Sequence, residues 1–156
     1  MQLTRFTDYS LRVLMYLAFR TDELPTIGEI ATDHGISENH LMKVVHRLAR
    51  LGYVETLRGR GGGLRLARPP ERIRVGAVVR DVEETLAPVE CLLATHRSEC
   101  RLLPSCRLQS VLRDAQQAFL GHLDGYTLRD LLSARAPPAL ATLHRRTRAR
   151  ARTRAQ

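Results

Sequence analysis

The sequence contains no tryptophan, and aromatic residues make up only 4% of its 156 residues. Hydrophobic residues still account for 44%, so a core can form, but leucine, valine and alanine must fill most of it. The first ten residues (MQLTRFTDYS) lack the apolar core of a signal peptide. No stretch approaches the roughly 18 continuous apolar residues that indicate a membrane span. The absence of a signal peptide and of a membrane span predicts a cytoplasmic protein with no membrane partner. The length of 156 residues predicts one domain, or a small domain with appendages.

Acidic residues are scarcer than basic ones, 16 against 25, which gives a formal net charge of +9. Such an excess favours a polyanionic partner. Residues 144–156 contain six arginines and no acid, and removing these six would leave only +3 of the +9. The body of the chain is therefore only mildly basic, so any affinity for DNA there must come from local clusters. Residues 137–156 are expected to form a disordered, arginine-rich tail that adds salt-sensitive, non-specific affinity.

The periodicity of the first half predicts a helix-turn-helix. A largely apolar helix over 8–20 is followed by Thr26 and Glu29, which form a capping-box pattern for a second helix. After a glycine-containing turn, Ser37 can cap a third helix over roughly 38–51. Apolar residues at helical spacing give this third helix an inward face, namely Leu41, Val44, Val45 and Leu48. A helix, a short turn and a helix with a basic outer face are the parts of a helix-turn-helix.

Two short strands follow, over 53–57 and 64–67, and the glycine-rich tip between them predicts a β-hairpin wing. The glycine run is not a phosphate-binding loop, because no Gly-Lys-Ser/Thr follows it and it leads into a strand rather than a helix. The predicted fold class is therefore mainly α, with a winged helix-turn-helix DNA-binding domain over 1–85.

The outer face of the third helix and the wing tip supply candidate DNA-binding residues. A single basic helix usually marks only a solvated surface, but a capped helix, a turn, a basic helix and an arginine-tipped wing in succession favour DNA binding. Side chains of the third helix would reach base edges or phosphates in the major groove. Arginines of the wing could enter the adjacent minor groove. The candidates are Ser37, Asn39, His40, Lys43, Arg47, Arg58 and Arg60.

The second half predicts an amphipathic helix over 73–85 and a long last helix over about 107–124. The stretch between them, 86–106, has no sustained periodicity and is predicted to be a loop. The apolar stripe of the last helix has no evident partner inside a small winged domain, so we assign 107–136 to dimerisation, with a short extra helix at 127–133. The stripe comprises Leu108, Val111, Leu112, Ala115, Phe119 and Leu123.

Only three cysteines occur, and all lie in the predicted loop with the spacing C-x8-C-x5-C, at Cys91, Cys100 and Cys106. In a reducing compartment, clustered cysteines are more often metal-binding or redox-active than disulfide-bonded. Simple burial of three thiols is disfavoured by the charged residues between them. Three interpretations of the cysteines remain, ranked from most to least favoured. They are an iron–sulfur cluster, a zinc site completed by His96 and a thiol switch. The cluster ranks first because long spacings between ligands suit a bulky group.

Several segments resemble the iron–sulfur winged-helix transcriptional regulators. The N-terminus has M-Q-L-T-x-F-T-D-Y-x-L-R-x-L (1–14) and the wing has G-Y-V-x-x-x-R-G-x-x-G-G-x-R-L (52–66). Further matches are I-R-V-G-x-V-V-R (73–80), C-R-L (106–108) and Y-T-L-x-D-L (126–131). Together they span nearly the whole chain up to the tail. F-T-D-Y and Y-T-L-x-D-L favour the nitric-oxide-sensitive branch of repressors within this family.

The resemblance implies a homodimer that binds double-stranded operator DNA and carries an iron–sulfur cluster in each subunit, 4Fe–4S with 2Fe–2S as the alternative. Cys91, Cys100 and Cys106 match the three thiolate ligands of the family, and Asp8 matches a carboxylate ligand supplied by the first helix of the partner. Without the resemblance, Asp8 would be interpreted only as an acidic residue near a helix N-terminus, where the helix dipole favours negative charge. Nitric oxide would attack the cluster, release the DNA and allow expression of nitric-oxide detoxification genes.

Two positions depart from the family pattern. The first cysteine gap is x8, longer than the x5 of the nitric-oxide branch and nearer to iron-responsive relatives. The cluster-biogenesis branch has a histidine three residues after its last cysteine, where this chain has Gln109. The predicted function is a nitric-oxide-sensing repressor and not an enzyme, because no catalytic base constellation accompanies the cysteines. The alternatives are a sensor of iron or cluster status and a zinc-stabilised DNA-binding module.

Overall fold

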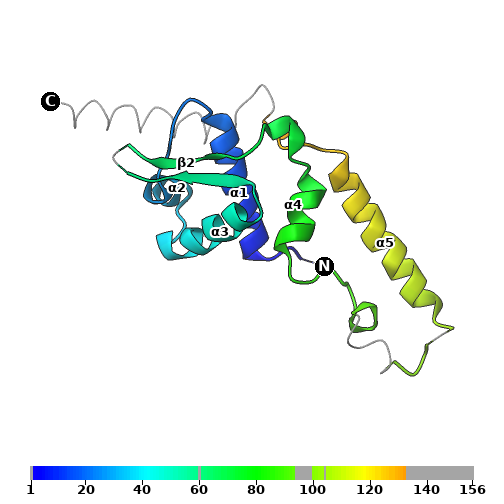
Figure 1. Cartoon of the computed structure of the whole chain (residues 1–156). Helices are drawn as coiled ribbons and strands as arrows, with labels where there is room; N and C mark the ends of the chain where they lie inside the picture. The colour runs from blue at the N-terminus through cyan, green and yellow to red at the C-terminus, as the bar shows by residue number, and fades with distance from the viewer. Residues whose placement is uncertain (1, 60, 94–99, 104, 133–156) are drawn as a thin grey trace.

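Three helices and a two-stranded hairpin form the N-terminal half of the fold, as predicted (Figure 1). The computed structural model describes residues 2–59, 61–93, 100–103 and 105–132. The main elements are α1 (Arg5–Phe19), α2 (Ile27–His34), α3 (Glu38–Arg50), β1 (Val54–Leu57), β2 (Gly63–Leu66), α4 (Val75–Val82) and α5 (Arg107–Asp124). Two short 3-10 helices, η1 (Pro70–Arg72) and η2 (Glu90–Leu92), lie before and after α4.

Local sequence sets where the helices of the helix-turn-helix begin. The hydroxyl of Thr4 accepts a hydrogen bond from the backbone N–H of Thr7 at 3.3 Å and so caps α1. The predicted capping box of α2 is present, because Glu29 donates its backbone N–H to the Thr26 hydroxyl and accepts the Thr26 N–H at 2.8 Å. Ser37 occupies the N-cap position of α3, but its side chain makes no capping hydrogen bond. The exposed Ser37 hydroxyl is therefore not used to start the helix.

The core lies where α1, α2, α3 and the hairpin meet. The inward face of α3 is the predicted one, with Leu41, Val44, Val45 and Leu48 all buried. Leu14 and Tyr16 of α1, Ile30 of α2 and Leu64 of β2 belong to the same cluster. Each buried aliphatic side chain of this kind stabilises the fold by roughly 1.5–3 kcal/mol. The helix that carries the basic face is thus anchored on its opposite side.

The wing is an antiparallel pair in which Val54 lies opposite Leu66. At its tip Gly59 and Gly61 have φ angles of 100° and 81°, which side chains with a Cβ rarely adopt. The hairpin predicted over 53–57 and 64–67 is confirmed to within one residue at each strand end.

The base of the wing is fixed to the loop that precedes α2. A Cβ on Gly63 would lie 2.2 Å from the carbonyl oxygen of Leu24, so only glycine fits at this crossing. The next residue, Leu64, donates its backbone N–H to the carbonyl of Pro25 at 2.9 Å. The wing therefore keeps a fixed angle to the helix-turn-helix.

The second half differs from expectation in two places. The helix predicted over 73–85 is shorter, Val75–Val82. It starts later because Leu128 donates its N–H to the Ile73 carbonyl at 2.7 Å and Thr127 pairs with Arg74. It ends earlier because the backbone turns to an extended conformation at Glu83. The pairing with Arg74 places Thr127 in an isolated bridge, and 128–131 form turns instead of the short helix expected over 127–133, whose last residue lies outside the described residues. The long helix predicted over 107–124 is present with those bounds.

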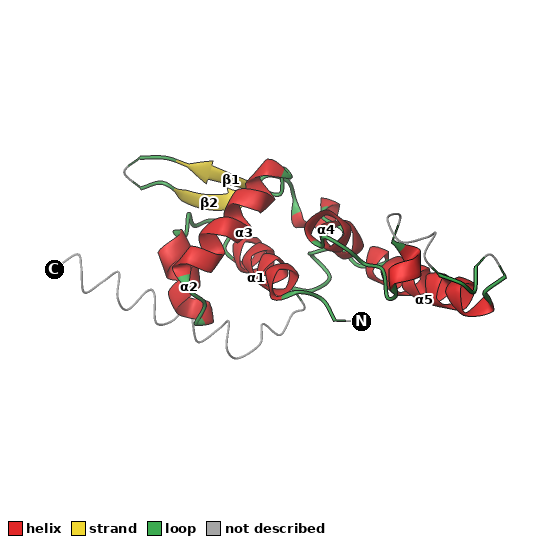
Figure 2. Ribbon diagram, turned by 90° about the horizontal axis from the view of Figure 1, so that it is seen from below, coloured by secondary structure: helices red, strands yellow, loops and turns green. Residues whose placement is uncertain are grey.

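Helix α4 lies between the winged unit and α5, which is the outermost of the helices in both views (Figures 1 and 2). Contacts join α1 to α4 and α4 to α5, so α4 connects the two parts of the fold. No helix in the described parts of the chain is long and apolar enough to span a membrane.

Candidate functional site: a basic helix and a cysteine segment

The outer side of α3 presents polar and basic side chains opposite its buried face. The candidate DNA contacts that lie on or before this helix are all exposed, namely Ser37, Asn39, His40, Lys43 and Arg47. Asn39, Lys43 and His46 recur at helical spacing on the side directly opposite the core, with Arg50 one turn further on. His46 was not among the predicted contacts, although its spacing of three residues from Lys43 could have found it.

Two of the predicted contacts lie on one flank of α3 rather than on its outermost side. His40 lies against Tyr9 of α1, with ring centroids 6.5 Å apart. Arg47 points toward α4, where its Nη2 donates to the backbone carbonyl of Asp81 at 2.9 Å. The predicted set and the outermost positions therefore overlap only in part, because Asn39 and Lys43 belong to both, whereas His40 and Arg47 lie on the flank.

The wing contributes Arg58, which is exposed beside the glycine tip. Arg60, the other predicted wing contact, lies outside the described residues. On the strand that follows, Arg65 pairs across the hairpin with Glu55 at 2.7 Å, so its charge is matched locally. Arg58 is therefore the described wing residue with the placement expected of a DNA contact.

Two buried tyrosine hydroxyls hold the elements around α3 in place. Tyr16 donates to Asp33 of α2, and Tyr53 donates to Asp81 of α4, each at 2.6 Å. Burial raises the pKa of both phenols, and the hydrogen bond to the carboxylate raises it further. Both tyrosines therefore stay protonated and keep donating throughout the physiological pH range.

Asp8 lies on α1, one turn after its first residue, and is about half exposed. Within the chain its carboxylate forms an ion pair with Arg12, Nε to Oδ1 at 3.0 Å. Such an exposed pair holds its partners weakly, because solvent screens it. Asp8 is thus placed where a group from outside the chain can reach it.

The cysteine segment follows α4 and leads into α5. Its three cysteines are free thiols, and each is half-buried. Cys91 lies in η2, Cys100 begins a turn closed by the Leu103 N–H at 3.2 Å, and Cys106 is the N-cap residue of α5. A helix N-terminus favours negative charge, which suits a thiolate ligand at Cys106.

Gln109 joins the two ends of the segment. Its Nε2 donates to the backbone carbonyl of Cys91 at 3.0 Å, which draws η2 onto the first turn of α5. This is the residue that stands where the cluster-biogenesis regulators carry a histidine. In this chain its amide has a structural partner on the cysteine segment.

The donor set fits an iron–sulfur cluster in kind, because thiolates are the usual cluster ligands, and it supplies three of the usual four from one short segment. The structure does not assemble them. Among the described residues, no group of three or more His, Cys, Asp or Glu side chains is arranged to hold a metal ion. His96, the candidate fourth zinc ligand, lies outside the described residues.

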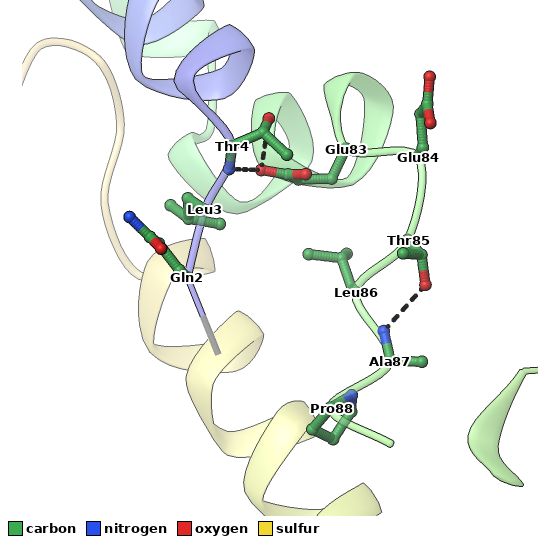
Figure 3. Close-up of a pocket in the computed structure, with 9 residues that line it drawn as sticks. All are labelled: Gln2, Leu3, Thr4, Glu83, Glu84, Thr85, Leu86, Ala87 and Pro88. Carbon is green, nitrogen blue, oxygen red and sulfur yellow. Dashed lines mark hydrogen bonds between the residues drawn. The ribbon is translucent and has the colours of Figure 1, made fainter. Parts of the chain in front are cut away.

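The entrance to the cysteine segment is tied to the start of α1 (Figure 3). The carboxylate of Glu83, just after α4, accepts the Thr4 N–H at 2.6 Å and the Thr4 hydroxyl at 3.1 Å. A cavity beside this contact is lined by residues 2–4 and 83–88. The helix that carries Asp8 and the segment that carries the cysteines therefore begin at one junction.

Comparison with known proteins decides the family. The Rrf2 family, described as an iron-dependent transcriptional regulator, matches residues 3–134. The chain belongs to the Rrf2 family. The regulator NsrR of Geobacillus kaustophilus is 54% identical over 137 residues, covering 87% of this chain and 92% of that protein. NsrR of Bacillus subtilis is 54% identical over 133 residues, covering 85% of this chain and 90% of that protein.

Solved structures agree with this Rrf2 assignment. The T. potens IscR structure superposes with a TM-score of 0.69 at 25% identity, over 85% of this chain and 86% of that one. The structure of CymR, the global cysteine regulator of B. subtilis, superposes with a TM-score of 0.67 at 26% identity, over 87% of this chain and 99% of that one. The winged-helix fold, the resemblance to the NsrR regulators and the expectation of a regulator rather than an enzyme are confirmed. The protein is a DNA-binding transcriptional regulator.

Proposed function

We propose that this regulator is a cytoplasmic homodimeric repressor whose iron–sulfur cluster senses nitric oxide and releases operator DNA. The observation that carries the proposal is the set of three free cysteines between α4 and α5, in a chain about half identical to NsrR proteins. The repressed genes are those for nitric-oxide detoxification, as the resemblance of F-T-D-Y and Y-T-L-x-D-L implies.

In the proposed DNA complex, α3 lies in the major groove and the wing tip in the adjacent minor groove. Ser37 and Asn39 are placed at the N-terminal end of α3, where helix-turn-helix proteins contact base edges. His40, Lys43 and Arg58 supply further contacts, and Arg60 is proposed on sequence alone. The guanidinium of Arg47 is bound to α4, so we do not count this residue among the contacts to DNA.

A second copy of the chain is proposed to cover the outer side of α5. Leu108 and Val111 are 61% and 53% exposed, and Leu102 just before the helix is 67% exposed. Water-exposed apolar residues recurring along one side of a helix indicate a partner surface. Two subunits joined here would present two α3 helices to half-sites about one DNA turn apart, roughly 34–36 Å.

The cluster is proposed to be 4Fe–4S, with 2Fe–2S as the alternative. Cys91, Cys100 and Cys106 hold it, and Asp8 of the other subunit supplies the fourth ligand. When bound, the cluster supplies iron that reacts with nitric oxide. The half-exposed Asp8, weakly paired with Arg12, suits a ligand that crosses between subunits. The assignment of 1–85, 86–106, 107–136 and 137–156 to DNA binding, cluster binding, dimerisation and tail stays a prediction.

Sensing of iron or of cluster supply is a second candidate on the same scaffold. The long x8 gap between the first two cysteines favours it, and the family description is that of an iron-dependent regulator. This alternative keeps the DNA interface and the ligands and changes only the signal.

Anaerobic titration of the purified full-length protein with nitric oxide tests the proposal. We expect a brown protein whose broad visible absorbance bleaches into nitrosyl-iron bands, together with loss of operator binding. Iron and acid-labile sulfide measured on the same sample control for cluster content. A brown protein that keeps its spectrum and its DNA in nitric oxide would point to iron sensing. A protein that stays colourless after reconstitution would exclude the iron–sulfur cluster. Stoichiometric zinc in that sample would then indicate a zinc site, and no zinc would indicate a thiol switch.

Asp8→Ala in the same titration tests the fourth ligand. We expect the cluster to form, because three thiolates remain, but with an altered visible spectrum and an altered rate of reaction with nitric oxide. Arg12→Ala is the matched control, since it removes the intrachain partner of Asp8 and leaves the carboxylate in place. A spectrum and a nitric-oxide response identical to those of the unsubstituted protein would exclude Asp8 from the site.

A further inference from the structure

We propose that Arg47 is a positioning residue, which holds the recognition helix α3 to the end of α4 and supports operator binding through that contact rather than by binding a phosphate. The proposal rests on the DNA-binding function and on the placement of α3 in the major groove given above. It concerns a residue whose basic character, taken alone, would assign it to the DNA.

The guanidinium of Arg47 satisfies a helix end. Its Nη2 donates at 2.9 Å to the carbonyl of Asp81, which lies 34 residues away in the sequence and in the last turn of α4. The last four carbonyls of an α-helix have no partner within the helix, and a cation there also complements the helix dipole. Arg47 therefore supplies a hydrogen bond and a charge that the end of α4 needs.

Asp81 receives a second anchor from the base of the wing. Its carboxylate accepts the hydroxyl of Tyr53 at 2.6 Å, and Tyr53 is only 3% exposed. Tyr53 lies three residues after the end of α3, and its N–H donates to the Leu48 carbonyl of that helix at 2.9 Å. The start of the wing and the recognition helix are thus fastened to the same residue of α4, one through the carboxylate and the other through the backbone.

The opposite side of α4 is fastened to the end of α5. Arg80, next to Asp81, binds Asp124 with both Nη atoms, at 2.7 and 2.5 Å. Arg74 donates to the Asp124 carbonyl at 2.7 Å. At Gly76 a Cβ would lie 2.1 Å from Asp124 Oδ1, so the two helices approach as closely as glycine permits. The ion pair keeps the pKa of Asp124 below its usual range.

These contacts make α4 a connector between the outermost helix and the DNA-reading helix. In Figure 2, α4 lies between α3 and α5, and neighbouring residues of α4 bind one to each side. If α5 forms the subunit interface, the Arg47 contact helps to set the distance and angle between the two α3 helices of a dimer. Loss of the contact should then weaken binding to correctly spaced half-sites and spare contacts to isolated phosphates.

Salt dependence separates this role from a phosphate contact. Each neutralised phosphate adds about −0.9 to the slope of log K against log salt. The experiment uses full-length protein purified anaerobically, matched for iron content. The two probes are a 40-base-pair duplex that the unsubstituted protein selects from a randomised pool and an unselected duplex of equal length. Arg47→Ala is compared with Lys43→Ala, a cation on the outermost side of α3.

For Arg47→Ala we expect affinity for the selected duplex to fall about three- to tenfold, with an unchanged salt slope and unchanged affinity for the unselected duplex. Lys43→Ala should make the slope shallower by about 1 and weaken both complexes. Tyr53→Phe should behave like Arg47→Ala, because a buried hydroxyl cannot touch DNA. Arg47→Gln removes the charge but keeps more of the side chain, and it is measured in parallel. It replaces Arg47→Ala in the comparison if the alanine variant unfolds at a lower temperature than the unsubstituted protein.

Either of two results would overturn the proposal. If removing Arg47 makes the slope shallower by about 1 and weakens both duplexes equally, the residue binds a phosphate. If affinity for the selected duplex does not change, the contact positions nothing. A Lys43→Ala protein with an unchanged slope would instead contradict the proposed placement of α3, which is a separate failure.

Discussion

Cys100→Ala is expected to yield a protein without iron or sulfide that no longer distinguishes operator from other DNA. Three thiolates are all that the chain can offer to a cluster, because Cys91, Cys100 and Cys106 are its only cysteines. With one ligand removed, the segment between α4 and α5 loses the group proposed to order it. Affinity for operator should fall by roughly 10³-fold or more, toward the level of non-specific binding.

The measurement combines iron and sulfide content, the visible spectrum and the dissociation constant for operator DNA, all without oxygen. Ser105→Ala is the matched control, because Ser105 is an exposed residue of the same segment and is not a ligand in the proposal. That variant should keep its colour and its affinity. Full repression by the Cys100→Ala protein in cells would refute a cluster-dependent mechanism outright.

The parts of the fold that the sequence predicted are those set by neighbouring residues. The capping box of Thr26 and Glu29 uses residues three apart. Gly35 ends α2 with a φ of 63°, a conformation that glycine adopts easily. The inward face of α3 follows from a helical repeat of apolar residues. In each of these patterns, residues a few positions apart interact directly and so determine the local structure. A single sequence is therefore enough to find them.

Contacts between residues far apart in the sequence produce no local pattern that would reveal them. Arg47 with Asp81 joins positions 34 apart, and Arg80 with Asp124 joins positions 44 apart. The sequence predicts Arg47 as a DNA contact, because a basic residue on a helix surface has the same local pattern whether it faces a phosphate or the end of a neighbouring helix. The choice between these roles depends on where α4 lies, which local periodicity does not determine.

The candidate cluster site shows the same division. The number and spacing of the cysteines predict thiolate ligands or a thiol switch, and the match to family motifs adds Asp8; both stay predictions. The hydrogen bond from Gln109 to the Cys91 carbonyl could not be foreseen, since it needs η2 folded back onto α5. Side-chain chemistry is thus visible in the sequence, whereas the arrangement of ligands depends on tertiary contacts and, in the proposal, on a second subunit.

The last helix shows how one apolar stripe can serve two surfaces. Helical periodicity groups six apolar residues of this helix into one stripe, namely Leu108, Val111, Leu112, Ala115, Phe119 and Leu123. In the fold, Leu112, Phe119 and Leu123 are half-buried and α5 packs against α4. Leu108, Val111 and Ala115 are exposed on an adjoining side. The first group faces the side on which α5 packs against its own chain, and the second is the surface that we propose a second subunit covers.

Val111→Asp is therefore expected to convert a dimer into monomers and to weaken operator binding by roughly 10²–10⁴-fold, because two linked half-site contacts become independent ones. Val111 lies in the middle of the exposed apolar group, and a carboxylate there would have to be buried without a partner on association. The fold itself should survive, since the residue is 53% exposed in the single chain.

Sedimentation equilibrium of the full-length protein measures the oligomeric state, and binding to one-half-site and two-half-site duplexes measures the consequence. Gln117→Asp is the matched control, because it places the same charge on the polar side of α5 at an exposed position. That variant should stay dimeric and keep its preference for two half-sites. If Val111→Asp also stays dimeric, the subunits meet elsewhere, and the spacing of the two recognition helices must be set by a surface other than the exposed side of α5.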